Sequence, residues 1–158
     1  MNWQEVCEHP GLKNLPFKIE LNEVGKIIMS PVKVWHSAFQ GEIEFLLRSL
    51  LQSGKTLPEC AIATSKGTKV ADVAWASDQT FQKIKQETEC SIAPEICIEV
   101  LSASNTQKEM EEKRQLYFSQ GAKECWLCSA EGNIRFFTPQ QESARSFLVP
   151  DFPIQITL

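Results

Sequence analysis

The chain has 158 residues, of which 42% are hydrophobic and 23% charged, and its formal net charge at pH 7 is −4. This length suits one domain, residues 1–158, built around one core, and the composition is ordinary for a soluble globular protein. The acidic balance disfavours a protein that coats nucleic acid by bulk attraction, and no apolar run approaches the roughly 20 residues that span a bilayer.

The N-terminal segment, MNWQEVCEHP, is polar and acidic, unlike a secretory signal, so we expect a cytoplasmic protein. Disulfides are rare in that reducing compartment. Cys125-Trp-Leu-Cys128 has the CxxC form of metal and redox motifs, but it lies in a strand-like run. Residues i and i+3 of a strand point to opposite faces, so we expect both thiols to pack in the core.

The first elements in the chain are predicted to be a helix and a hairpin. Residues 2–9 suit a short helix. Phe17–Leu21 and Lys26–Met29 suit two strands joined by a turn over Asn22–Gly25, because Gly ends the turn. Ser30-Pro31 is expected to break the second strand.

The clearest helix is predicted at Val34–Gln52, where apolar residues recur at helical spacing. Gly54 follows as a typical end signal. His36 and Gln40 interrupt the apolar face of this helix. A lone His on such a face is most often a core residue with its hydrogen bonds satisfied.

Two strands and a short helix are predicted next. The strands are Leu57–Thr64 and Thr68–Trp75, with a turn at Ser65-Lys66-Gly67 between them. The helix lies near Asp78–Gln86 with Ser77 as its cap.

The run Ile96–Leu101 is too short for a globular helix and is rich in β-branched residues, which is typical of a strand buried on both faces. A polar turn and a helix follow. Asn105 or Thr106 is the expected N-cap, and Gly121 is the expected end. Lys113 lies near the middle of the buried face of this helix.

A last hairpin is predicted over Cys125–Ser129 and Ile134–Phe137, and the tail from Phe147 to Leu158 is expected to form a strand or an extended wrap. Helices and strands alternate without a regular rhythm. We therefore expect an α+β or mixed α/β fold, in which one mixed sheet is flanked by the two longer helices.

Three charged residues stand out because each interrupts a buried surface: Asp72 and Glu99 in strands, and Lys113 in a helix. Any one alone would most often be an edge residue or a stray ion pair. Two carboxylates on adjacent strands repel unless a cation lies between them. Mg²⁺ takes carboxylate oxygens and waters, and a lysine beside a metal-bound water can orient or deprotonate it for attack on a phosphodiester.

The motifs resemble a known family. Lys69-Val-Ala-Asp72-Val, Glu99-Val-Leu-Ser102, Glu112-Lys113…Tyr117…Gly121 and Glu124-Cys-Trp126 follow one another in the order found in the Uma-two (Uma2) family, which is common in cyanobacteria. Met29-Ser30-Pro31 ahead of His36 is similar to the opening of that family. The resemblance runs from about Gly25 to Phe152.

This family is a branch of the PD-(D/E)xK nuclease superfamily and is described as restriction endonucleases. The resemblance implies a restriction-endonuclease-like core, a central mixed β-sheet flanked by helices. It also implies that Asp72 takes the place of the Asp of the PD element and Glu99 that of the acid of (D/E)xK. Ala71 replaces the Pro, and Leu101 stands where the superfamily has Lys. Lys113 is then the matching lysine, moved to the following helix.

The resemblance implies further site residues. The superfamily often adds a Glu or Gln from its first helix, and Gln40, on the same face as His36, is the match. The backbone carbonyl of Val100 is expected to join Asp72 and Glu99 as a metal ligand. Tyr117 is expected either to hydrogen-bond in the site or to pack beside it.

The leading hypothesis is a Mg²⁺-dependent endonuclease, with Mn²⁺ as a substitute, that cuts DNA. We expect a homodimer, because cutting both strands of a duplex needs two sites. The first alternative is a catalytically inactive nuclease-fold protein acting as a binding or assembly module, which the acidic net charge favours. The second is a thiol redox protein that uses Cys125 and Cys128.

Overall fold

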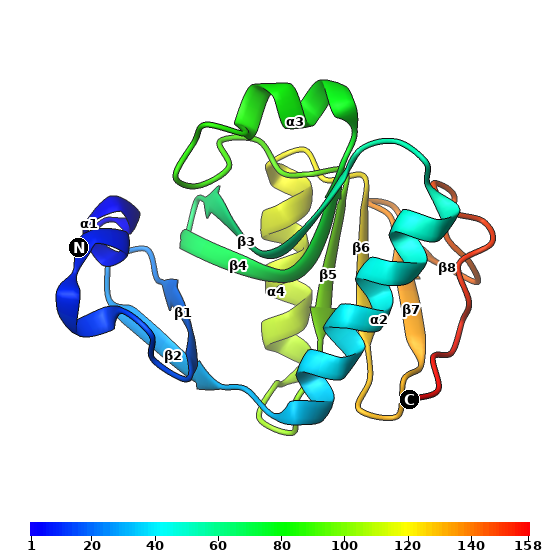
Figure 1. Cartoon of the computed structure of the whole chain (residues 1–158), viewed down its shortest axis with the longest axis horizontal. Helices are drawn as coiled ribbons and strands as arrows, with labels where there is room; N and C mark the ends of the chain where they lie inside the picture. Colours follow the sequence, from blue (N-terminus) through cyan, green and yellow to red (C-terminus); the bar gives the residue numbers. More distant parts are fainter.

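The computed structural model describes residues 1–158. Its central sheet has six strands in the order β3-β4-β5-β6-β7-β8 (Figure 1). Their bounds are Lys55–Thr64, Gly67–Ala76, Ile96–Val100, Glu124–Cys128, Ile134–Phe137 and Glu142–Ser143. β5 and β6 run parallel, while the other neighbouring pairs are antiparallel. The sheet is therefore mixed, which confirms the predicted fold class.

Each face of this sheet packs on a different helix (Figure 1). Phe39, Ile43 and Leu47 of α2 (Val34–Leu50) share a buried cluster with Ile96 and Ile98 of β5. On the other face, a second cluster joins Tyr117 of α4 (Gln107–Ser119) to Cys97 of β5 and Cys125 of β6. Successive residues of a strand point to opposite faces, so β5 contributes to both cores.

The hairpin forms a separate two-stranded sheet of β1 (Phe17–Leu21) and β2 (Ile27–Pro31), which stands beside β4 at one end of the molecule (Figure 1). The expected break at Ser30-Pro31 is wrong, because both residues stay paired, Ser30 with Lys18 and Pro31 with Phe17. A proline at the last position of an edge strand removes no ladder hydrogen bond from a central strand.

Shorter elements complete the chain. α1 (Trp3–Glu8) and a 3₁₀ turn (Pro10–Leu12) precede the hairpin, and α3 (Asp78–Ile84) begins at the Ser77 cap. The tail contains no strand after Ser143; instead Val149, Phe152 and Ile156 pack into the α2 core cluster. Of the two predictions for the tail, a strand or an extended wrap, the structure has the extended wrap. None of the helices combines the length and apolarity needed to cross a bilayer.

Candidate active site

Asp72 and Glu99 face each other where β4 and β5 part. The antiparallel ladder pairs Trp75 with Ile96 and ends at Val73 and Ile98. Continuing that register by one residue on each strand makes Asp72 and Glu99 the next opposite pair. Directly opposite residues of an antiparallel pair have neighbouring side chains, so the end of this ladder brings the two acids together, as the sequence predicted.

Asp72 is 1% exposed and fully hydrogen-bonded. The backbone N–H of Val100 donates to Oδ2 at 2.8 Å, and the Lys18 ammonium donates to Oδ1 at 2.9 Å. His36 Nε2 lies 3.3 Å from Oδ2. Burial alone would raise the pKa of Asp72, but the Lys18 charge and the His36 hydrogen bond outweigh burial and lower it. Asp72 is therefore held as a carboxylate.

The two polar residues predicted on the buried face of α2, His36 and Gln40, both contact Asp72. His36 Nδ1 lies 3.2 Å from Gln40 Oε1, and Gln40 Nε2 donates to the backbone carbonyl of Asp72 at 2.8 Å. That carbonyl lies where the β3–β4 ladder skips a pair, opposite Glu59, which has a positive φ of 50°. Gln40 thus contacts the backbone of Asp72, while His36 contacts its carboxylate, and the hydrogen bond raises the pKa of His36.

Glu99 is buried on the α4 side of the sheet. The Tyr117 hydroxyl donates to Oε1 at 2.7 Å, and the Lys113 ammonium lies 2.9 Å from the same oxygen. Lys18 lies 3.1 Å from Oε2. Burial nevertheless raises the pKa of Glu99, because the neighbouring lysines only partly offset desolvation. Two roles were predicted for Tyr117, a hydrogen bond in the site or packing beside it. The hydrogen bond is present, and the ring also packs in the core cluster under α4.

Lys113 reaches the site because α4 is fixed at both ends. A capping box joins Thr106 and Glu109 at its N-terminus, and Gly121 takes a positive φ of 105° just past its end. The Lys113 side chain is 9% exposed and bridges Glu99 to Glu20 of β1, with 2.9 Å to each carboxylate. The predicted orientation of Lys113 toward the sheet is confirmed.

Sequence reasoning missed Lys18 and Glu20 of β1. Glu20 also accepts a hydrogen bond from the backbone N–H of Val70 at 2.6 Å. Burial would lower the pKa of Lys18, but Glu99 and Asp72 outweigh it and hold that pKa well above its usual value. Both residues alternate with apolar neighbours in Phe17–Leu21, a pattern typical of a solvated strand face. The one signal in the sequence was that the polar face of this strand carries charges of both signs, Lys18 and Glu20.

The donor set fits a hard divalent cation. Asp72 and Glu99 are buried carboxylates that already share one cation, the Lys18 ammonium. No group of three His, Cys, Asp or Glu side chains with metal-binding geometry is present. Mg²⁺ does not need one, because it usually keeps several waters and binds one or two carboxylates. Val100 lies beside Asp72 at the end of β5, although its role as a carbonyl ligand stays a prediction.

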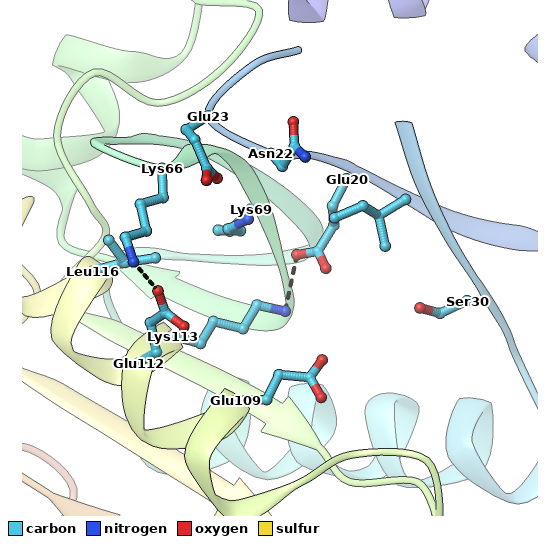
Figure 2. A pocket seen from close by; sticks show the side chains of 11 residues that line it. Glu20, Asn22, Glu23, Ser30, Lys66, Lys69, Glu109, Glu112, Lys113 and Leu116 are labelled. Atoms are coloured by element: carbon cyan, nitrogen blue, oxygen red, sulfur yellow. Dashed lines mark hydrogen bonds and ion pairs between the residues drawn. The ribbon is translucent and has the colours of Figure 1, made fainter. Parts of the chain in front are cut away.

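An open cavity adjoins this site between the hairpin and α4 (Figure 2). It has a volume of about 300 Å³. Lys113 and its partner Glu20 form one wall, and Lys66, Lys69 and Glu112 line the side toward the β3–β4 turn (Figure 2). Lys66 pairs with Glu112 and Lys113 with Glu20, so the lining of this entrance carries both charge signs.

The two thiols of the CxxC motif are separated by the sheet. Cys125 belongs to the core cluster under α4 and Cys128 to the cluster under α2. Burial raises the pKa of Cys125 well above its usual value and that of Cys128 to about 12. A reactive thiol needs a lowered pKa, so this arrangement disfavours the thiol redox hypothesis and supports core packing.

Comparison with known proteins agrees with the fold and the motifs. No curated protein matches the chain. A crystal structure titled as a putative nuclease belonging to DUF820, from Anabaena variabilis ATCC 29413, is similar with a TM-score of 0.70 and 23% identity, covering 90% of this chain and 82% of that chain. The model of the Uma2 family, described as "Putative restriction endonuclease", matches residues 3–154. The chain therefore belongs to the Uma2 family of nuclease-like proteins.

Proposed function

We propose that this protein is a Mg²⁺-dependent endonuclease that hydrolyses phosphodiester bonds in DNA. The observation that carries the proposal is that Asp72 and Glu99 lie opposite each other at the open end of the β4–β5 ladder, with Lys113 reaching Glu99 from α4. Buried carboxylates are costly unless a cation holds them. Family membership supports the same activity.

Asp72, Glu99 and the Val100 carbonyl would hold the metal, with Mn²⁺ as a substitute for Mg²⁺. When bound, the ion supplies Lewis acidity toward a phosphate oxygen and lowers the pKa of a water. His36 and Gln40 keep Asp72 in place through its carboxylate and its carbonyl. Tyr117 orients Glu99 through the hydrogen bond to Oε1.

Lys113 is the proposed catalytic lysine. Its ammonium can donate to an attacking water or steady the negative charge that grows on the phosphate. The adjoining cavity reaches Lys113 from solvent, and Lys66 and Lys69 are the other cationic groups that a nucleic acid strand entering there would meet, beside glutamates of the same lining.

The test is cleavage of supercoiled plasmid in Mg²⁺ or Mn²⁺. Asp72→Ala is expected to abolish cleavage with the fold retained by circular dichroism, and Asp72→Asn, which preserves the side-chain shape, should do the same. Asp151→Ala removes an exposed acid from the tail and serves as the matched control. Cleavage by clean Asp72→Ala and Asp72→Asn preparations at the wild-type rate would rule out the assignment.

A non-catalytic binding or assembly module is the second candidate. The observation in its favour is that lysines already pair with both acids. Calorimetric titration with Mg²⁺ or Mn²⁺ distinguishes the two. Binding that is lost in Glu99→Gln supports the endonuclease, whereas no binding by the wild type supports the inactive module.

We also propose that the protein is a homodimer, because cutting both strands of a DNA duplex needs two active sites. Sedimentation velocity tests this oligomeric state.

A further inference from the structure

The Lys18 ammonium occupies the position between the two acids. It lies 2.9 Å from Asp72 Oδ1 and 3.1 Å from Glu99 Oε2, and its side chain is 10% exposed. These are the carboxylates that the proposed function assigns to a divalent cation. A single ammonium that donates to both therefore holds the place where a shared cation would bind.

The charge of the site supports a competition at this position. Three carboxylates, Asp72, Glu99 and Glu20, are neutralised in part by two ammonium groups, Lys18 and Lys113. With Lys18 removed, these acids and Lys113 leave two negative charges, which one divalent cation would balance. With Lys18 present, the same ion would bring a second positive charge into a buried site next to an ammonium, which like-charge repulsion opposes.

The space at the acids leads to the same conclusion. The cavity that Lys18, Asp72, Glu99 and Val100 line is only about 40 Å³, room for very few waters. A hydrated Mg²⁺ keeps several waters, so it needs the volume that the ammonium fills. Glu109 lines both this cavity and the larger one beside it, and thus offers a displaced ammonium an acidic partner. The long lysine stem allows that movement.

We propose that Lys18 is an internal competitor for the metal: its ammonium holds Asp72 and Glu99 together in the metal-free protein and must leave before a divalent cation binds. This inference rests on the proposed function. It goes further in assigning a role to β1, because the hairpin carries the group that sets how much free metal is needed. In the metal-free state, Lys18 also offsets the repulsion that would otherwise separate the two acids.

The first test is calorimetric titration of the full chain with Mn²⁺ for the wild type, Lys18→Met and Lys108→Met. Lys18→Met keeps an unbranched, flexible side chain one atom shorter and removes the charge. Lys108→Met is the matched control, since it removes an exposed lysine of α4. Lys18→Met is expected to bind Mn²⁺ roughly tenfold tighter or more, because the ion no longer has to break a buried ion pair. Lys108→Met is expected to bind as the wild type does.

The second test uses the wild type alone and so does not depend on the folding of a variant. Acetylation by an amine-reactive reagent is followed by mass spectrometry with and without saturating Mn²⁺. Lys18 is expected to react slowly without metal and several-fold faster with it, while the exposed Lys108 reacts equally in both.

The outcomes separate the inference from the proposed function. If neither the wild type nor Lys18→Met binds Mn²⁺, the metal site itself is wrong. If both bind with equal affinity, or if Lys18 stays protected in the saturated wild type, the metal site stands and the competition is overturned.

Discussion

At the residue scale, Tyr117 shows how closely the site depends on single contacts. It is the only hydroxyl that donates to Glu99, at 2.7 Å, and it is 1% exposed. Tyr117→Phe keeps the ring in the α4 core cluster and leaves a buried carboxylate with one donor fewer. We expect a loss of about 1–3 kcal/mol in the free energy of unfolding, measured by urea denaturation. An unchanged midpoint and slope would contradict a structural role for this hydrogen bond.

Single residues also show which parts of the site could be predicted from the sequence. Asp72, Glu99 and Lys113 could be found because each breaks a buried pattern, so their burial needed an explanation. Lys18 and Glu20 follow the alternation of an ordinary amphipathic strand. The two charge signs on that face were the only local signal, because whether a polar face turns to solvent or onto a site depends on where the hairpin docks.

At the element scale, α4 depends on its first turn. The Thr106 side chain accepts from the Glu109 N–H at 3.1 Å within the capping box. Thr106→Ala removes that cap and is expected to cost about 1 kcal/mol, which lowers the melting temperature by roughly 2–4 °C for a chain of this size. Thr106→Ser retains the hydroxyl and should restore the melting temperature. Equal melting of Thr106→Ala and wild type would show that the cap contributes nothing.

The start of α3 gives a pH-dependent prediction. Glu95 accepts from the Ser77 N–H at 3.1 Å and from the Thr80 hydroxyl at 3.0 Å. Burial would raise the pKa of Glu95, but the Ser77 hydrogen bonds outweigh it and lower that pKa. A lowered folded-state pKa stabilises the protein above the unfolded-state value, about 4.3, and that stability is lost as the pH falls through the folded-state value.

Glu95→Gln should therefore destabilise the protein at pH 7, with a difference from the wild type that shrinks as the pH falls from about 5 to 3. Urea unfolding across this range measures the difference, and Glu111→Gln, an exposed acid on α4, is the control. A difference that is constant over the range would contradict the cause assigned to the shift.

Most elements could be predicted because periodicity and caps are local signals. Helix α4 begins at the predicted Thr106 cap, and α3 at the predicted Ser77 cap. The error at Ser30-Pro31 has a tertiary cause, because a proline ends a strand only where its missing N–H is needed. At the end of β2 it is not needed. The tail was ambiguous for a similar reason: its apolar residues enter the core, and its only strand-like pairing is one isolated bridge between Gln155 and Asn133.

At the scale of the whole molecule, the site exists because two sheets meet. The six-stranded sheet supplies Asp72 and Glu99, and the hairpin supplies Lys18 and Glu20. No sequence signal placed the second sheet against the first. The two sheets approach closely at Gly67, at the start of β4, where a Cβ would come within 2.3 Å of the backbone oxygens of Leu21 and Asn22.

Gly67→Ala tests this docking. Gly67 has a positive φ of 88°, so any side chain costs about 1–2 kcal/mol in backbone strain, and here it also pushes the hairpin away. We expect faster amide hydrogen exchange in residues 17–31, because the ion pairs of Lys18 and Glu20 are loosened together. Gly121→Ala is the matched control, since Gly121 has a φ of 105° but nothing within 4 Å of the added carbon. It should lower stability through strain alone and leave exchange in the hairpin unchanged. If both variants left the hairpin equally protected, the two sheets would be held by something other than this contact.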